Sequence, residues 1–284
     1  MSLAEINADD ATGDTKRIYE AIEVALGVRL VNLVYRHLAT VPGALEWAWA
    51  VVGQPFQTGV IKEHSEVLVS LVTGVNDGQL AKGGGSEVGS CLTSTEHSIV
   101  CDTLSAYNRA NPMNAIGLLV IALALKAGRP ARFHRPEVVI STTLPELLPL
   151  GRLEGLNPQI TETLNTLASL TADGEPRIVP SLYRHFINWP AFLTELVDWL
   201  EPLSTGGTID RISMQILVRA NEIAKQVFSE LPVVEPVSVS PDIETRSTLI
   251  KTIEIFPPTI CRMIVIGAML CDALRRPGLS GTVG

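Results

Sequence analysis

The sequence predicts an all-α protein built as a tandem duplication of one helical unit, and three observations lead to this prediction. Apolar residues recur at helical spacing in several segments, two blocks of sequence occur twice in the same order, and no regular polar–apolar alternation suggests a sheet. The chain has 284 residues, of which 46% are hydrophobic and 18% are charged, so it can bury a large core. The same composition argues against disorder.

The first repeated block is a Tyr-Arg-His triplet followed by a proline. The triplet occurs at residues 35–37 and again at residues 183–185, a separation of 148 (183 minus 35). Pro42 recurs as Pro190 at the same separation. Because proline suits the first turn of a helix, both prolines are predicted to begin one.

The second repeated block is the apolar run LLVIALAL, which begins at Leu118 and recurs as MIVIGAML from Met263, 145 residues later. Two collinear blocks at a nearly constant offset indicate two equivalent helical units that pack about a pseudo-twofold axis. Units of this size are too long for a solenoid repeat. The predicted organisation is helical repeat 1 at residues 1–135, a linker at 136–158 and helical repeat 2 at 159–284.

Apolar spacing predicts the individual helices. Residues 15–26, 61–72 and 209–228 each carry an apolar face with a helical repeat, and Gly27 follows the first of them as a stop signal. Residues 138–141 (VVIS) are a possible short strand, but nothing else indicates a sheet.

A terminal signal predicts one further helix, over residues 94–109. Thr93 and Glu96 have the spacing of a capping box, in which each side chain bonds the other's backbone N–H. Asn111 precedes Pro112, and a residue before proline is disfavoured in helical geometry. The backbone of Asn111 is therefore predicted to leave the helix and to turn its amide into a cavity.

Composition also limits the partners and the location of the protein. The formal net charge is −8 and there is no basic stripe, so we expect no nucleic acid partner. The longest apolar runs, at 115–125 and 263–270, are too short to cross a bilayer and predict buried core helices and no membrane association. The acidic N-terminus lacks the pattern of a signal peptide, and the four cysteines form no C-x-x-C, so we expect reduced thiols and a cytoplasmic location.

Short motifs that would mark a known chemistry do not occur in the sequence. It contains no G-x-x-x-x-G-K-[ST], no H-E-x-x-H and no G-x-S-x-G. The glycine run at 83–85 does not continue as G-x-G-x-x-G and is predicted to be a loop, and residues 63–66 (EHSE) are predicted to be a solvated helical face. We therefore predict no metal and no cofactor.

The twin triplets allow two interpretations. In the structural interpretation, tyrosine and arginine span the boundary between core and water, and the duplication copied them. In the functional one, the imidazoles of His37 and His185 meet near the pseudo-axis as acid and base. Successive helical residues point about 100° apart, so a whole triplet cannot face one pocket, and this favours the structural interpretation.

Three short motifs occur in an order shared with a known family. They are Leu26-Gly-Val ahead of R-x-L-A-T-x-P-G at 36–43, N-x-x-N-P at 108–112, and N-W-P at 188–190. Through these motifs, which span almost the whole chain, the sequence resembles the group I 2-haloacid dehalogenases, which act on D- and L-2-haloalkanoic acids. The resemblance implies two helical repeats per subunit, a homodimer and an active site between the repeats. It also implies that a carboxylate activates water, which displaces halide directly with inversion.

Carried over residue by residue, the resemblance retains some functional positions and changes others. The asparagine that positions water is Asn111, and the serine that holds the substrate carboxylate is Ser181. The catalytic aspartate that follows this serine is replaced by Leu182, so the chain resembles a diverged member of the family. The positions that are aromatic in the family hold Leu30, Leu33 and Asn114.

The missing aspartate leaves the position of a general base open. Leucine cannot take a proton from water, and such help is worth on the order of 10²–10⁴-fold in rate. Glu254, in the apolar stretch at 252–258, is one candidate, because a carboxylate flanked by isoleucines would be desolvated. The alternative is that Glu254 pairs with a core arginine such as Arg36 or Arg184.

These observations support two functional hypotheses. The first is a hydrolase that attacks a small 2-substituted carboxylic acid with water, with Asn111 and Glu254 as its catalytic groups. The second is a non-catalytic protein that binds a small apolar carboxylate between its halves, since leucines in place of aromatics and aspartate make the pocket less reactive. A peroxidase of the alkylhydroperoxidase type is set aside because it needs a C-x-x-C. Both main hypotheses predict one cavity lined by Asn111, Ser181, Leu182, Leu30 and Leu33.

Overall fold

The computed structural model describes residues 3–73, 88–136, 144, 146–172, 178–232 and 241–275. These residues form helices and connecting segments, with no β-strand beyond the single bridge residue Ala131. The predicted all-α class is confirmed. The possible strand at 138–141 and the glycine run at 83–85 lie outside the described residues.

The helices occur in a similar order along the two halves of the chain. The first half contains η1 (Ala8–Asp10), α1 (Gly13–Leu26), α2 (Leu33–Leu38), α3 (Ala44–Gln57), α4 (Val60–Thr73) and α6 (Ser94–Lys126). The second half contains α7 (Pro158–Thr171), α8 (Ser181–His185), η2 (Phe186–Asn188), α9 (Pro190–Thr205), α10 (Thr208–Glu230), α11 (Ile243–Glu254) and α12 (Phe256–Arg275). A duplication would produce such an order, and the duplication itself stays a prediction.

Helix α6 begins directly after the predicted capping box, but it does not end near residue 109 as predicted. Glu96 N donates to Thr93 Oγ1 at 3.3 Å, and Thr93 N donates to the Glu96 carboxylate at 2.8 Å. The helix then continues through Pro112 to Lys126, so Asn111 keeps a helical backbone and the predicted break there is wrong. A proline inside a helix costs about 3 kcal/mol. Here the almost completely buried second half of the helix offsets that cost.

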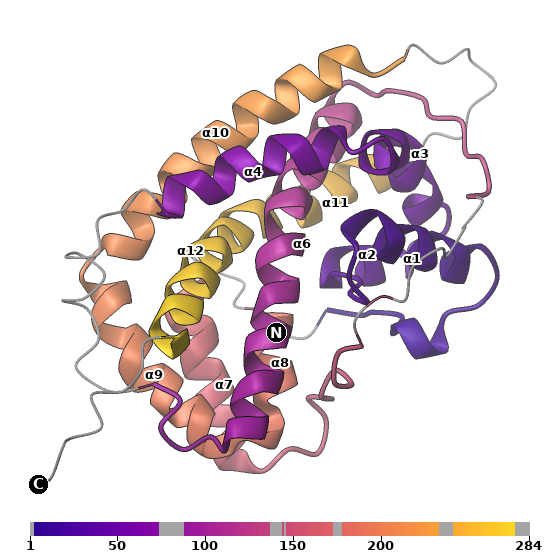
Figure 1. Cartoon of the computed structure of the whole chain (residues 1–284). Coiled ribbons are helices and arrows are strands. Elements are labelled where there is room, and N and C mark those ends of the chain that lie inside the picture. Colours follow the sequence, from indigo (N-terminus) through magenta and orange to yellow (C-terminus); the bar gives the residue numbers. More distant parts are fainter. Residues whose placement is uncertain are drawn as a thin grey trace, which may run out of the picture.

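Helices α6 and α12 form a central antiparallel pair (Figure 1). Asn108 Nδ2 donates to the Gly267 carbonyl at 3.1 Å, and His97 Nε2 bonds the Leu274 carbonyl at 2.9 Å. Gly267 permits this close approach, because a Cβ atom there would lie 2.2 Å from Asn108 Oδ1. The two apolar runs of the sequence lie in this pair and are buried, as predicted.

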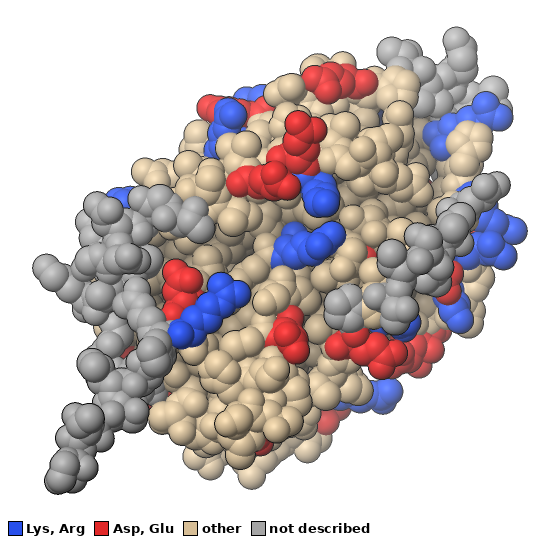
Figure 2. Space-filling model, in the orientation of Figure 1, with Lys and Arg blue, Asp and Glu red and all other residues tan. Residues whose placement is uncertain are grey.

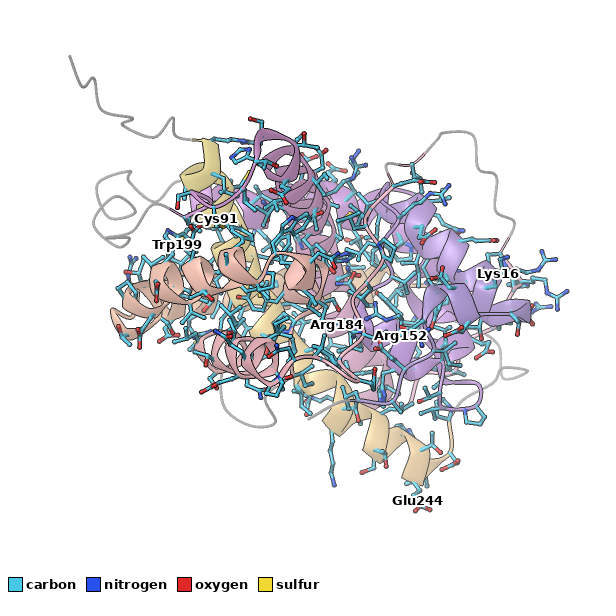
Figure 3. The ribbon with its side chains drawn as sticks, turned by 90° about the horizontal axis from the view of Figure 1, so that it is seen from below. Lys16, Cys91, Arg152, Arg184, Trp199 and Glu244 are labelled. Carbon is cyan, nitrogen blue, oxygen red and sulfur yellow. The ribbon has the colours of Figure 1, made fainter. Side chains whose placement is uncertain are left out.

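The other helices surround this pair (Figure 1). Helices α4 and α10 pack against each other and against both central helices, while α1–α3 lie at one end of the molecule and α7–α9 at the other. The short helix α8 contacts α6. In Figure 3, Arg184 of α8 lies near the middle of the view.

One helical stretch passes a length and composition test for a membrane span. Residues Ile243–Arg275 have a mean hydropathy of 1.6 over the most apolar window, and 72% of that window is buried inside the molecule. The stretch is longer than the apolar run at 263–270 because α11 and α12 follow each other almost directly. A core helix passes the same test, and the burial of this one is that of a core helix.

On the visible face in Figure 2, acidic and basic side chains are interspersed.

Candidate functional site

A cavity of about 70 Å³ lies between α2, α6, α8 and the start of α12. A single water needs about 10–15 Å³ in the same measure, so the cavity has room for a small organic acid. Its wall is mostly apolar, and its polar side chains are Asn32, Tyr107, Asn111, Ser181 and Thr259. No Asp or Glu lines it among the described residues.

The residues expected to share one cavity are divided between two. Asn111, Ser181, Leu182 and Leu33 line the cavity together. Leu30 instead lines a neighbouring cavity of about 500 Å³, which corrects the prediction of one leucine wall. Leu30 and Leu33 would lie on the same side only if the segment between them were helical. Helix α2 begins at Leu33, so Leu30 lies outside it and its side chain faces the other cavity.

Glu254 does not lie at the cavity. It was predicted either to act there as a base or to pair with a core arginine, and both predictions are wrong. Its side chain is 45% exposed and pairs with Lys126 Nζ at 2.5 Å, rather than with a core arginine. Successive helical residues point about 100° apart, so with Ile253 fully buried, Glu254 turns outward. It is not among the described residues that line the cavity and offers no desolvated base there.

A chain of three asparagines orients Asn111. Asn114 Nδ2 donates to Asn32 Oδ1 at 2.8 Å, and Asn32 Nδ2 donates to Asn111 Oδ1 at 3.4 Å. Asn114 is fully buried behind the cavity, so it supports the site rather than lining it. Because Oδ1 of Asn111 is used in this way, its Nδ2 is left as a donor that no described group occupies.

Ser181 is joined to a buried cluster of charges that the sequence did not predict. Arg36 Nη2 donates to Ser181 Oγ at 3.3 Å, and Arg36 Nε donates to Glu5 Oε2 at 2.7 Å. Arg184 Nη1 donates to the other oxygen of Glu5, Oε1, at 2.8 Å. Both arginines of the twin triplets therefore bind one carboxylate. Burial raises the pKa of Glu5, but the charges and hydrogen bonds of the two arginines outweigh it and hold the pKa below its usual value.

Backbone contacts hold the N-terminal segment that carries Glu5 against α1 and α2. Ile6 N donates to the Arg36 carbonyl at 3.1 Å, and Tyr19 Oη donates to the Ile6 carbonyl at 3.0 Å. His37 Nδ1 bonds the Ala4 carbonyl at 2.8 Å. This segment has no apolar period, and the only sequence signal that could have found Glu5 is the need of two core arginines for a counter-ion.

Tyr107 and His185 form the wall between the two cavities. Their rings meet edge to face with centroids 5.7 Å apart, and Tyr107 lines the smaller cavity while His185 lines the larger. Tyr107 lies beside the Ser181 hydroxyl, and burial raises the pKa of Tyr107 more than Arg36, Arg184 and Ser181 lower it, so its hydroxyl remains a protonated donor. Burial, with a smaller contribution from Arg36 and Arg184, lowers the pKa of His185 to about 4. The arginines of the triplets meet at one carboxylate, whereas the imidazoles have separate surroundings.

The comparisons with known proteins agree with this architecture. No protein-family model matches the chain, and no curated protein sequence matches it. A crystal structure of a D-2-haloacid dehalogenase mutant is similar over 96% of both chains, with a TM-score of 0.74 and 15% identity. The chain has the haloacid dehalogenase fold.

Two further structures with this fold carry a bound molecule. A D-2-haloacid dehalogenase in complex with L-LA and a mutant in complex with D-2-CPA have TM-scores of 0.68 and 0.67, each at 14% identity and 96% coverage of both chains. At such identity, the likeness to these dehalogenases describes the architecture of the chain.

Proposed function

We propose that this chain is a haloacid dehalogenase-like protein that binds a small, largely apolar 2-substituted carboxylic acid in the 70 Å³ cavity. The observation that carries the proposal is that Ser181 and Asn111 offer polar groups to one mostly apolar cavity. Such a cavity, with a few convergent polar groups, is typical of small-molecule sites. The apolar wall suits the 2-substituent, and the serine hydroxyl suits the carboxylate.

Binding without efficient turnover is the form of this function that the site supports best. Direct hydrolysis requires a group that takes a proton from water as its oxygen attacks C2 and the halide leaves. Leu182 stands where the related enzymes are expected to hold that group, and no described carboxylate lines the cavity. Loss of general-base help costs on the order of 10²–10⁴-fold in rate.

Hydrolysis by direct water attack is the second candidate, and one observation favours it. Asn111 Nδ2 is left free by the asparagine chain, so it can donate to the oxygen of a water in the cavity. A water held there would displace halide from C2 with release of a 2-hydroxy acid. Its proton would have to pass to solvent.

The decisive experiment restores the missing carboxylate with Leu182→Asp and uses the isosteric Leu182→Asn as its matched control. Chloride release from D- and L-2-chloropropionate is measured for both variants and the wild type. We expect at least roughly 10²-fold more release from Leu182→Asp than from Leu182→Asn or the wild type. Because burial raises the pKa of a carboxyl group, the assay is run up to pH 9.

Thermal-shift titration of the wild type with the same acids tests binding itself. Saturable stabilisation without chloride release supports the binding proposal. Wild-type release well above the Leu182→Asn control would support the hydrolytic candidate instead. No saturable shift with any short carboxylic acid would contradict both.

A further inference from the structure

Two thiols and an imidazole lie together where the N-terminal part of α6 meets the C-terminal part of α12. Cys101 Sγ lies 3.7 Å from His97 Nδ1, and His97 Nε2 lies 2.9 Å from the Leu274 carbonyl of α12. A carbonyl oxygen only accepts hydrogen bonds, so Nε2 carries the proton of the neutral ring. Nδ1 therefore presents its lone pair to Cys101, and the Cys101 thiol donates to it. This is the arrangement of a nucleophile with a base that a third group orients.

The second thiol, Cys271, faces this pair from α12. Hydrogen bonds from Asn108 and from His97 join α6 to α12 at two levels. Cys101 lies two turns before Asn108 on the same face of α6, and Cys271 lies one turn after Gly267 on the same face of α12. Both thiols therefore lie between the two interhelical bonds, on the faces that meet. Cys271 is 6% exposed, so it is shielded from solvent while it faces Cys101.

The surroundings of Cys101 differ from those of Cys91, the most exposed cysteine. Burial raises the pKa of both thiols, and so do Cys271 beside the first and Glu195 beside the second. Neither thiol ionises readily by itself, so a base must take the proton as the sulfur reacts. Cys101 has an imidazole for this purpose. Glu195 is a weaker base, and its oxygens already accept three hydrogen bonds from the 89–91 segment.

We propose that Cys101 is a site at which a hydroperoxide oxidises this protein, with His97 as its base and Cys271 as its resolving thiol. The sulfur of Cys101 attacks the terminal oxygen of the hydroperoxide as His97 Nδ1 takes the thiol proton. The O–O bond breaks, the proton passes to the leaving oxygen, and an alcohol or water departs from a sulfenic acid. The sulfur of Cys271 then attacks the sulfenic sulfur, which forms the disulfide and releases water.

This site is separate from the proposed function. None of its three side chains is among the described residues that line the small cavity or the larger one. The oxidation can therefore be tested whether or not the protein binds a carboxylic acid.

Hydrogen peroxide is the probe, added to the reduced full chain, and each thiol is followed by differential alkylation and mass spectrometry. We expect one disulfide per chain, between Cys101 and Cys271, that dithiothreitol reverses. Cys91 and Cys261 should stay reduced, although Cys91 is the more exposed. In Cys271→Ser, dimedone should trap a sulfenic acid on Cys101, and in Cys101→Ser no disulfide should form.

His97→Gln tests the base. The glutamine amide can still donate to the Leu274 carbonyl, but it has no basic lone pair for the thiol. Oxidation of Cys101 should slow by at least roughly ten-fold, while the rate at Cys91 stays unchanged. His134→Gln, which changes a histidine outside α6 and α12, is the matched control and should behave as the wild type. Circular dichroism checks the fold of each variant.

Three results would each overturn the inference. The first is oxidation of Cys91 at least as fast as that of Cys101. The second is a sulfenic or sulfinic acid on Cys101 that does not pair with Cys271 in the wild type. The third is a His97→Gln variant that is oxidised as fast as the wild type, which would leave His97 with a structural role alone.

Discussion

The two Tyr-Arg-His triplets have the same sequence but different surroundings. In the first, Tyr35 Oη is buried without a described partner, and His37 is half-buried against a backbone carbonyl. In the second, Tyr183 Oη bonds Thr171 Oγ1 at 2.8 Å, and His185 is buried beside a cavity. Only the arginines behave alike, since both bind Glu5.

A repeated sequence therefore does not imply a repeated role. Of the two arginines, only Arg36 donates to Ser181, a residue that lines the small cavity, whereas Arg184 Nε donates to the Gly151 carbonyl. A carboxylate outside both triplets joins the two arginines, so the site as a whole is asymmetric.

Removing the shared counter-ion should have the largest effect. Glu5→Gln leaves two buried guanidinium groups without a negative charge, and breaking a buried pair costs about 3–5 kcal/mol. Urea denaturation should show a loss of stability of that order. Asp14→Asn, which breaks the surface pair with Arg135, is the control and should change stability little. Equal effects of the two variants would mean that the buried cluster is energetically unimportant.

The histidine of the second triplet, His185, should couple folding to pH. The pKa of His185 is about 4 in the folded state against its usual value of 6.5, so the unfolded state binds more protons between these two pH values. The free energy of unfolding should therefore fall as pH drops from 6.5 to 4, by roughly 3 kcal/mol. Unfolding curves at several pH values measure this slope. His185→Phe should flatten this slope, and an unchanged slope in that variant would assign the pH dependence to another group.

The smallest expected effect is the difference in stability between the phenylalanine variants of Tyr35 and Tyr183. Tyr183→Phe removes a buried hydrogen bond to Thr171 and should cost about 1 kcal/mol. Tyr35→Phe removes a buried hydroxyl that has no described partner, so it should be neutral or slightly stabilising. Denaturant midpoints of the two variants give the comparison. Equal losses would indicate that Tyr35 Oη has a partner such as a bound water.

Several elements were predictable because their signals are local. The capping box of Thr93 and Glu96, the glycine stop after α1 and the apolar face of α10 each depend on residues within a few turns. The end of α6 was missed because burial of its second half outweighs the preference of a proline to break a helix. Local preference decides a helix boundary only when tertiary packing does not oppose it.

By itself, the sequence determined the all-α class, the position of most helices, and the polar pair Asn111 and Ser181 as candidates for one cavity. Only the tertiary structure decided that Leu30 and Glu254 lie outside that cavity and that Glu5 joins two arginines next to it. The reason is distance along the chain. Glu5 and Arg184 are 179 residues apart, and no local pattern records which carboxylate a buried guanidinium will meet. The orientation of a side chain at the end of a helix, and the counter-ion of a core charge, are settled when the helices pack.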